Sequence, residues 1–195
     1  APEKEFDDIS KIASQICGTP ISLITLIDEE RQWFKSTHGI ELTDTPRTIA
    51  FCAHAIADPE NMLVVNDTTK DERFVDNPFV IGDPPVMYYA GAPLVTSEGY
   101  ALGTICVIDN EPRELNQEQL DALKALSNQV MLLFELRKKN VEINRSKILF
   151  QHLVERAEDY VYEVNAKGVF SYCNPQIPKD TGFSQAELAK MHYTE

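Results

Sequence analysis

The sequence predicts an α+β fold in which an antiparallel sheet is covered by helices on both faces. The sheet is predicted by apolar, β-branched runs that occur in pairs joined by short turns, residues 21–27 with 32–37 and residues 86–96 with 100–109. In addition, the run 100–109 is apolar at both alternating sets of positions, which is typical of a strand covered on both faces. The fold therefore needs helical layers above and below the sheet.

The helices follow from apolar residues at helical spacing. One lies between positions 6 and 16 and ends before Gly18-Thr19-Pro20, and a long one follows Asn116. We expect this pair to cover one face. A short helix after Arg47 and the polar loop 67–85 would cover the other face, where a cavity could lie. Residues 39–47 are expected to be loop, and residues 62–65 a short strand.

The long helix has a well-marked start and an extended apolar pattern. Asn116 and Gln119 form a capping pattern, and neither Gly nor Pro occurs again before Gly168. Eight residues that alternate steps of four and three form a heptad seam, a stripe along one side of the helix. They are Leu123, Ser127, Val130, Phe134, Arg137, Val141, Asn144 and Ile148. Such a stripe can dock on the chain's own core. Because it continues past the preceding domain, we expect a parallel homodimeric coiled coil through the helix from Asn116 to Val154.

A change of pattern after residue 158 marks a further segment. Residues 160–164 and 169–173 read as a hairpin, and Ser184 with Glu187 reads as a capping box that begins a helix. A lone hairpin is marginally stable in water, so this segment is expected to be part of a larger domain. The predicted organisation is a complete domain over residues 1–138, a helical linker over 139–157 and an incomplete domain over 158–195.

Composition excludes several classes of partner. The formal net charge of −13 would repel nucleic acid, and the basic residues around 137–147 read as a solvated helix face. No apolar run approaches the roughly 20 residues that a membrane span needs, and no signal peptide is visible. The four cysteines form no Cys-x-x-Cys pair and have no zinc-ligand spacing. We therefore expect a reducing, cytoplasmic setting, no metal, and no membrane contact in this stretch of chain.

Four segments carry a family resemblance. They are Arg47-Thr48-Ile49-Ala50-Phe51-Cys52-Ala53-His54-Ala55-Ile56, Val65-Asn66-Asp67, Tyr88-Tyr89-Ala90-Gly91-Ala92-Pro93-Leu94 and Leu102-Gly103-Thr104-Ile105-Cys106-Val107-Ile108-Asp109. With the order of elements, they resemble the GAF domains that precede bacterial histidine kinases and diguanylate cyclases. The segment with Lys167-Gly168, Asn174-Pro175 and Thr181-Gly182-Phe183-Ser184 resembles the opening of a PAS domain.

The resemblance implies a regulatory sensor module of a bacterial signalling protein. A small molecule or a redox change sensed in the GAF pocket would act through the dimeric helix on an output enzyme outside this sequence, a kinase or a cyclic-dinucleotide enzyme. The chain itself is expected to have no catalytic activity. Two alternatives remain open: a dimerisation and spacer module with a filled cavity, and an enzyme similar to free methionine sulfoxide reductases.

The candidate ligand-binding residues are polar anchors and aromatic side chains around the expected cavity. Arg47 and His54 could hold an anionic group, although His54 can equally be a hydrogen-bonded structural residue. Because Tyr88 and Tyr89 are adjacent on a strand, only one of them can face the cavity. The full candidate set is Arg47, Phe51, His54, Asp67, Phe74, Tyr88 and Tyr89.

No cofactor is indicated by the motifs. The Cys-His pair by which some GAF domains attach a bilin has no counterpart, and the signature of cyclic-nucleotide-binding GAF domains is not matched in spacing. Cys52 falls where the reductase family has a cysteine, but residues 74–85 contain no thiol to act as the catalytic one. The identity of any ligand is therefore left unknown.

Overall fold

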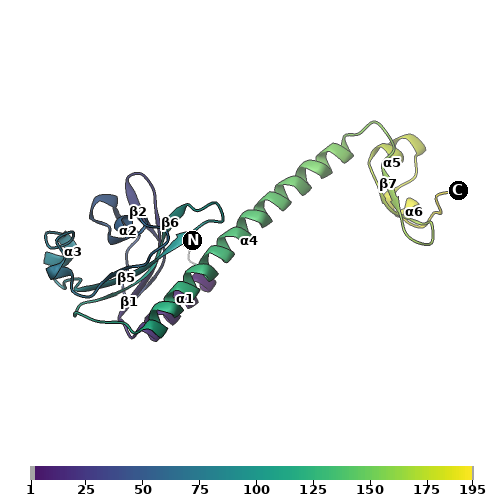
Figure 1. Cartoon of the computed structure of the whole chain (residues 1–195). Coiled ribbons are helices and arrows are strands. Elements are labelled where there is room, and N and C mark those ends of the chain that lie inside the picture. Colours follow the sequence, from purple (N-terminus) through teal and green to yellow (C-terminus); the bar gives the residue numbers. More distant parts are fainter. Residues whose placement is uncertain (1–2, 195) are drawn as a thin grey trace. The chain divides into compact units, whose positions relative to one another are not determined.

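The computed structural model describes residues 3–194, which form two compact units that divide between Glu135 and Leu136. The first unit contains a six-stranded antiparallel sheet with strand order β3-β2-β1-β6-β5-β4. The predicted α+β class, with helices on both faces of the sheet, is confirmed (Figure 1).

The central strands arise from the two predicted hairpins. β1 (Ile21–Ile27) pairs with β2 (Arg31–His38), and β5 (Tyr88–Val95) pairs with β6 (Ala101–Asp109). β1 and β6 then join the hairpins side by side. Gly103 makes this junction possible, because a Cβ at that position would lie 1.9 Å from the carbonyl oxygen of Thr25.

Short strands complete both edges of the sheet. β4 (Leu63–Val65) pairs with β5, as the apolar run around residues 62–65 predicted. β3 (Asp44–Pro46) pairs with β2, which corrects the expectation that residues 39–47 are entirely loop. Its three residues carry no alternating apolar pattern, so only the ladder with β2 defines it as a strand.

One face of the sheet is covered by α1 (Lys4–Cys17) and the first part of α4 (Gln117–Glu155). Ile105 and Val107 of β6 belong to the same buried cluster as Leu123 and Val130 of α4. The predicted capping box of α4 is present, with Asn116 Oδ1 accepting from Gln119 N at 2.9 Å. The two helices are thus anchored on the strand that lies at the centre of the sheet.

This packing corrects the prediction for the heptad seam. Leu123, Ser127 and Val130 are buried within their own chain, and Phe134 packs on Phe6 of α1. The first half of the stripe is therefore an intramolecular face, because α1 and the sheet supply the partner that the sequence pattern could not show. Later apolar residues of the helix are exposed, namely Val141, Ile143, Ile148, Leu149, Phe150 and Leu153.

The opposite face carries short elements. They are η1 (Arg47–Ile49), α2 (Phe51–Ala55), η2 (Thr68–Lys70) and α3 (Pro78–Ile81). Ala50 is extended, with φ −80° and ψ 121°, and separates η1 from α2. This break resets the helical phase, so that Phe51 and Cys52 are both buried while His54 is exposed.

The second unit has a hairpin of β7 (Tyr162–Val164) and β8 (Phe170–Cys173), followed by α5 (Gln176–Thr181) and α6 (Gln185–Leu188). The capping box of Ser184 and Glu187 begins α6, as predicted. Asn174 is fully buried, and its Nδ2 donates to the carbonyl oxygens of Val154 and Asp159. This side chain closes the last turn of α4. In the described residues, no helix is both long and apolar enough to cross a membrane.

Candidate functional site

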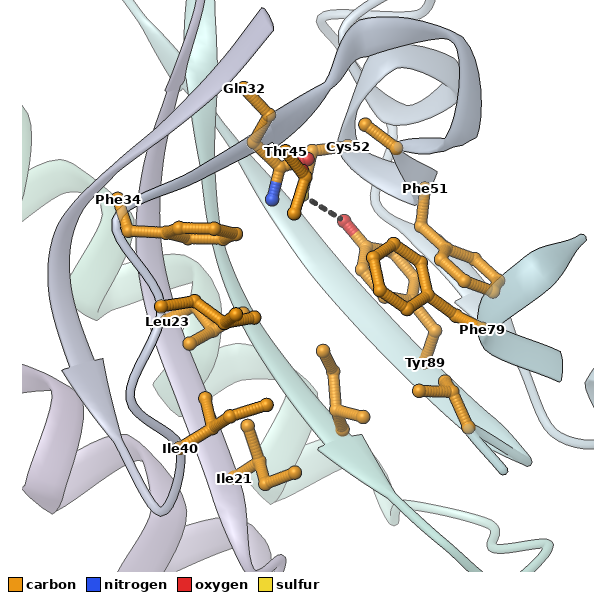
Figure 2. Close-up of a pocket in the computed structure, with 14 residues that line it drawn as sticks. Ile21, Leu23, Gln32, Phe34, Ile40, Thr45, Phe51, Cys52, Phe79 and Tyr89 are labelled. Carbon is orange, nitrogen blue, oxygen red and sulfur yellow. Dashed lines mark hydrogen bonds between the residues drawn. The ribbon is translucent and has the colours of Figure 1, made fainter. Parts of the chain in front are cut away.

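A small cavity lies between the sheet and α2. Its volume is about 60 Å³, and its walls come from β1, β2, β3, β5, β6, α2, α3 and the segment before β3 (Figure 2). Leu23, Phe34, Phe51 and Tyr89 give it an apolar lining. Ile40 and Leu42, each 37% exposed, form its outer rim. Ligand sites usually measure hundreds of cubic ångströms, so this cavity has room for only a few heavy atoms.

Two buried polar atoms in the cavity wall have no hydrogen-bond partner among the described residues. They are Gln32 Oε1 and Thr45 Oγ1, from residues that are 5% and 8% exposed and that face each other across the β2–β3 ladder. Each such atom costs about 1–3 kcal/mol when it is left unpaired. Because both oxygen atoms are themselves buried, a molecule in the cavity could bond to them only after a rotation of these side chains.

A buried thiol forms another part of the wall. The Sγ atom of Cys52, on α2, accepts hydrogen bonds from Thr104 Oγ1 at 3.0 Å and from Tyr89 Oη at 3.3 Å. The Sγ atom of Cys106, on β6, lies 4.0 Å away. Tyr89 reaches this position across Gly91, where a Cβ would come within 2.2 Å of its hydroxyl oxygen. This explains why Gly91 follows Tyr89 at a spacing of two.

The two thiols differ in acidity. Burial raises the pKa of Cys52, but hydrogen bonds from Cys106, Thr104, Thr25 and Tyr89 outweigh it, so that the pKa lies below the ordinary value. The hydrogen bond to Cys52 and burial both raise the pKa of Cys106 well above its ordinary value. Of the two sulfurs, Cys52 is therefore the one that more readily loses its proton.

The aromatic candidates lie in two different places. Phe51 stacks on Tyr89 and on Phe74, with ring centroids 5.2 Å and 4.4 Å apart, and Phe51 and Tyr89 line the cavity. Phe74 is fully buried behind Phe51 and does not line it. Tyr88 faces the opposite side of the sheet, in the cluster beneath α1 and α4. The expected opposition of the two tyrosines is present, and Tyr89 is the one at the cavity.

Arg47 and His54 come together outside the cavity. Both line a shallow surface hollow together with Thr48, and Arg47 Nη1 donates to the carbonyl oxygen of Asp28 at 2.8 Å. His54 is exposed, and its ring meets Phe74 edge-on at 4.9 Å. The structure therefore does not place these two side chains as anchors for a molecule in the cavity.

Asp67 caps a turn instead of lining the cavity. It begins η2 by accepting a hydrogen bond from Thr69 N at 3.1 Å, and it pairs with Lys70 Nζ at 2.7 Å. The hydrogen bonds from Lys70 and Thr69 lower the pKa of this carboxyl below its ordinary value. Aspartate side chains commonly accept such hydrogen bonds from the backbone of a following turn.

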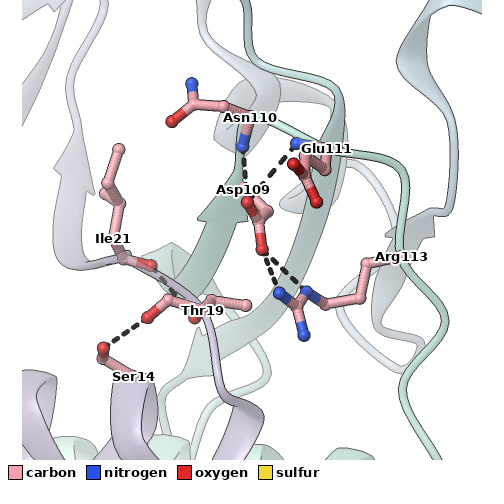
Figure 3. A network of polar contacts seen from close by, with 7 residues as sticks. All are labelled: Ser14, Thr19, Ile21, Asp109, Asn110, Glu111 and Arg113. Atoms are coloured by element: carbon pink, nitrogen blue, oxygen red, sulfur yellow. Dashed lines mark hydrogen bonds and ion pairs between the residues drawn. The ribbon is translucent and has the colours of Figure 1, made fainter.

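A second polar cluster holds the connection between β6 and α4. The buried carboxylate of Asp109 accepts from Arg113 Nε at 2.7 Å and from the backbone nitrogen of Asn110 at 2.7 Å (Figure 3). Its ion pair with Arg113 fixes the chain as it leaves the sheet. Sequence reasoning missed this cluster, as well as Gln32, Thr45 and Cys106. The spacing of four between Asp109 and Arg113 was its only available signal.

No group of three or more metal-binding side chains occurs within residues 3–194. The chemistry available at the cavity is therefore that of one small apolar space, two unpaired hydrogen-bonding atoms and a pair of thiols.

The antiparallel sheet, with α1 and α4 on one face and a small cavity under α2 on the other, defines a layered α+β domain with a small internal cavity. The family model described as the GAF domain matches residues 1–133, and the chain belongs to this family. The likeness to GAF domains that was seen in the sequence motifs is thereby confirmed.

One curated relative extends the comparison. The protein named cyclic di-GMP phosphodiesterase from Pseudomonas aeruginosa is 47% identical over 111 residues, which cover 57% of this chain. The chain spans only 19% of the length of that relative. The similarity therefore concerns one segment of a much longer protein.

Solved structures show the same fold at low identity. A domain of a putative two-component sensor histidine kinase from Sinorhizobium meliloti gives a TM-score of 0.55 at 14% identity, covering 75% of this chain and 98% of that one. Free methionine-R-sulfoxide reductase from Neisseria meningitidis, solved with its substrate, gives 0.57 at 14% identity, covering 70% and 80%. Both a sensor and an enzyme thus share this fold, which by itself does not decide between them. Together with the family membership, these relatives support a regulatory module of a signalling protein.

Proposed function

We propose that the first unit is a sensor module whose cavity admits a small neutral molecule and whose state is passed to an output enzyme through α4. The observation that carries the proposal is that β6 contributes side chains to the buried cores on both faces of the sheet. Cys106 and Ile108 belong to the core on the cavity side, and Ile105 and Val107 belong to the core beneath α4. A displacement of this strand by an occupant of the cavity moves both layers, because packed interiors transmit strain.

The cavity defines the chemistry of the occupant. An apolar lining and a volume of about 60 Å³ favour a compact, mostly apolar molecule. Gln32 Oε1 would accept a hydrogen bond from it, and the hydroxyl of Thr45 can donate or accept one. A cyclic nucleotide or a bilin is far larger than this space, which agrees with the absence of their sequence signatures.

The output is proposed from the relatives. The Pseudomonas protein carries a similar segment and is named for cyclic di-GMP hydrolysis, so an enzyme of cyclic-dinucleotide turnover is the favoured partner domain. A histidine kinase remains the second possibility, with the Sinorhizobium domain as its support. The 158–195 segment, expected to open a PAS domain, would lie between the sensor and that output.

Dimerisation belongs to the same proposal, in a narrower form than the sequence predicted. The part of α4 from Val141 to Leu153 exposes large apolar side chains. A second copy of the helix, aligned in parallel, would bury them and carry the signal as a change in register or rotation.

An isosteric substitution tests whether the cavity binds a ligand. Thr45→Val removes an unpaired buried hydroxyl, so without ligand the variant should be as stable as wild type or up to about 1 kcal/mol more stable. A molecule that copurifies with wild type, detected by native mass spectrometry, should be reduced or absent in the variant. Thr25→Val is the control, because its hydroxyl is already bonded to Thr104 and its loss should destabilise the fold.

The spacer alternative has its support in the stacked rings of Phe51, Phe74 and Tyr89, which pack against one another beside the small cavity. That alternative predicts that no copurifying molecule is found and that no small neutral compound raises the melting temperature of wild type. Such a result would overturn ligand sensing while leaving the family membership intact.

A further inference from the structure

We propose that Cys52 and Cys106 form a dithiol oxidation site, in which a small hydroperoxide entering the cavity converts the two thiols into a disulfide. The chemistry is independent of the proposed function. Only its regulatory consequence rests on the sensor role of the first unit.

The geometry of the pair carries the proposal. The sulfur atoms lie 4.0 Å apart, on α2 and on the central strand β6, and both residues are at most 2% exposed. A disulfide bond is about 2.05 Å long, so the sulfurs must approach by about 2 Å. Side-chain rotation and a small shift of the short helix α2 can supply this movement. Cys17, the other buried thiol of this unit, belongs to the opposite core.

The surroundings of the two sulfur atoms determine which one is the nucleophile and which one is the resolving thiol. Donation by Thr104 and Tyr89 stabilises negative charge on Cys52, which makes this sulfur the nucleophile. Cys106 keeps its proton and acts as the resolving thiol. No local sequence pattern indicates this partnership, because the two residues are 54 positions apart.

Access to the pair selects the oxidant. Cys52 lines the cavity, whereas Cys106 does not, so an incoming molecule meets the nucleophile first. A volume of about 60 Å³ accommodates hydrogen peroxide, which is little larger than water. An amino-acid sulfoxide has several times as many heavy atoms and does not fit without opening of the rim at Ile40 and Leu42.

The reaction balances in two steps. Cys52 loses its thiol proton and its thiolate attacks one oxygen of the hydroperoxide, so that an S–O bond forms as the O–O bond breaks. The leaving oxygen takes up the proton that Cys52 released and departs as an alcohol, or as water from hydrogen peroxide. The Cys106 sulfur then attacks the sulfenic sulfur of Cys52. An S–S bond forms, the S–O bond breaks, and the proton of Cys106 leaves with the hydroxide as water. Two thiols lose two electrons, and the hydroperoxide gains them.

A disulfide here would tie α2 to β6 at a sensitive point. Cys106 is flanked by Ile105 and Val107, which pack beneath α4 on the other face. Pulling Cys106 towards α2 therefore disturbs the buried cluster that Ile105 and Val107 share with Leu123 and Val130. Oxidation would act on α4 by the same route as an occupant of the cavity.

Peptide mapping of the whole chain tests the proposal. After exposure to hydrogen peroxide, the folded protein is denatured with an alkylating reagent and digested. We expect the Cys52 and Cys106 peptides to be joined, with the mass of two hydrogen atoms missing, and to separate on addition of dithiothreitol. Recovery of both residues as alkylated thiols, or oxidation at Cys17 in their place, would overturn the proposal.

Variants resolve the two roles. In Cys106→Ser, oxidation should stop at a sulfenic acid on Cys52, which dimedone captures, whereas Cys17→Ser should form the cross-link at the wild-type rate. In Cys52→Ser, the rate of peroxide consumption should fall about tenfold or more. An unchanged rate would overturn the assignment of Cys52 as the nucleophile. If a serine variant does not fold, alanine replaces serine, and the wild-type map still decides the case.

Two further experiments distinguish this proposal from a methionine sulfoxide reductase activity and from the sensor role. Free methionine sulfoxide in place of peroxide should give no cross-link, and a cross-link formed with release of methionine would overturn the hydroperoxide assignment in favour of a reductase. Hydrogen exchange of α4 in the oxidised protein reports the regulatory consequence. A cross-link without any change in α4 would support the oxidation site and contradict the sensor role alone.

Discussion

Phe134 of α4 packs against Phe6 of α1 with ring centroids 5.0 Å apart. Phe6 is fully buried, so the contact fastens the long helix to the core of its own domain. The same position had been expected to face a second copy of the chain. The contact therefore assigns the first half of the apolar stripe to folding and leaves only the second half for association.

Phe134→Lys tests this assignment. Loss of the ring packing and burial of a cation at the edge of the core should lower the free energy of unfolding by about 2–3 kcal/mol, measured by chemical denaturation. Leu132→Lys is the matched control, because Leu132 is 48% exposed on the same helix and should change stability little. Equal stability of the two variants would show that Phe134 does not belong to the core.

Ile148→Lys tests the proposed dimer. Ile148 lies on the predicted seam and is 55% exposed, so a charge there should weaken self-association about tenfold or more without unfolding the first unit. Sedimentation equilibrium measures the effect. Asn140→Lys adds the same charge to an exposed position off the seam and should leave association near the wild-type value. A monomeric wild-type chain would contradict the dimer proposal outright.

Arg113→Ala tests the clamp between β6 and α4. The Asp109 carboxylate is buried, whereas Arg113 is partly exposed. We therefore expect the free energy of unfolding to fall by about 1–3 kcal/mol, which is less than for a fully buried pair. Arg31→Ala removes a pair with Asp28 in which both side chains are more than half exposed. Arg31→Ala is the control, and it should lower the free energy of unfolding by less than about 1 kcal/mol. Similar losses in both variants would mean that the clamp contributes no more than a surface pair.

Asn174→Ala tests how the β7–β8 hairpin is joined to the end of α4 within the second unit. Its Nδ2 donates to three carbonyl oxygens, of Val154, Ala157 and Asp159, and its Oδ1 accepts from Val161 N. Loss of these bonds should destabilise the hairpin by roughly 2 kcal/mol, visible as faster amide exchange in β7 and β8. Asn140→Ala, at an exposed position of α4, serves as the control. Unchanged exchange would contradict the capping role.

The sequence predicts those parts of the fold that depend on local chemistry. The hairpins of β1 with β2 and of β5 with β6 follow from apolar runs separated by turns, and the two capping boxes join residues only three positions apart. The docking of α4 could not be predicted in this way, because the stripe through Phe134 has the same spacing whether its partner is α1 or another chain.

The candidate site was predicted less completely for a related reason. Phe51 and Tyr89 were found because they belong to a recognisable motif, and they do line the cavity. Gln32 and Thr45 become notable only when β3 pairs with β2 and leaves their oxygen atoms without partners. Cys52 and Cys106 become a pair only when the sheet and α2 are assembled. Such properties belong to the tertiary structure and not to any local pattern.

The central claim is that β6 couples the cavity to α4. Hydrogen exchange tests it directly in Ala50→Leu, which places a larger side chain at the cavity wall, with Thr48→Leu as an exposed neighbour outside it. The account predicts altered protection in the part of α4 from Leu123 to Met131 in Ala50→Leu, and wild-type protection there in Thr48→Leu. Changes confined to α2 and the cavity rim, with α4 unaffected in both variants, would contradict it.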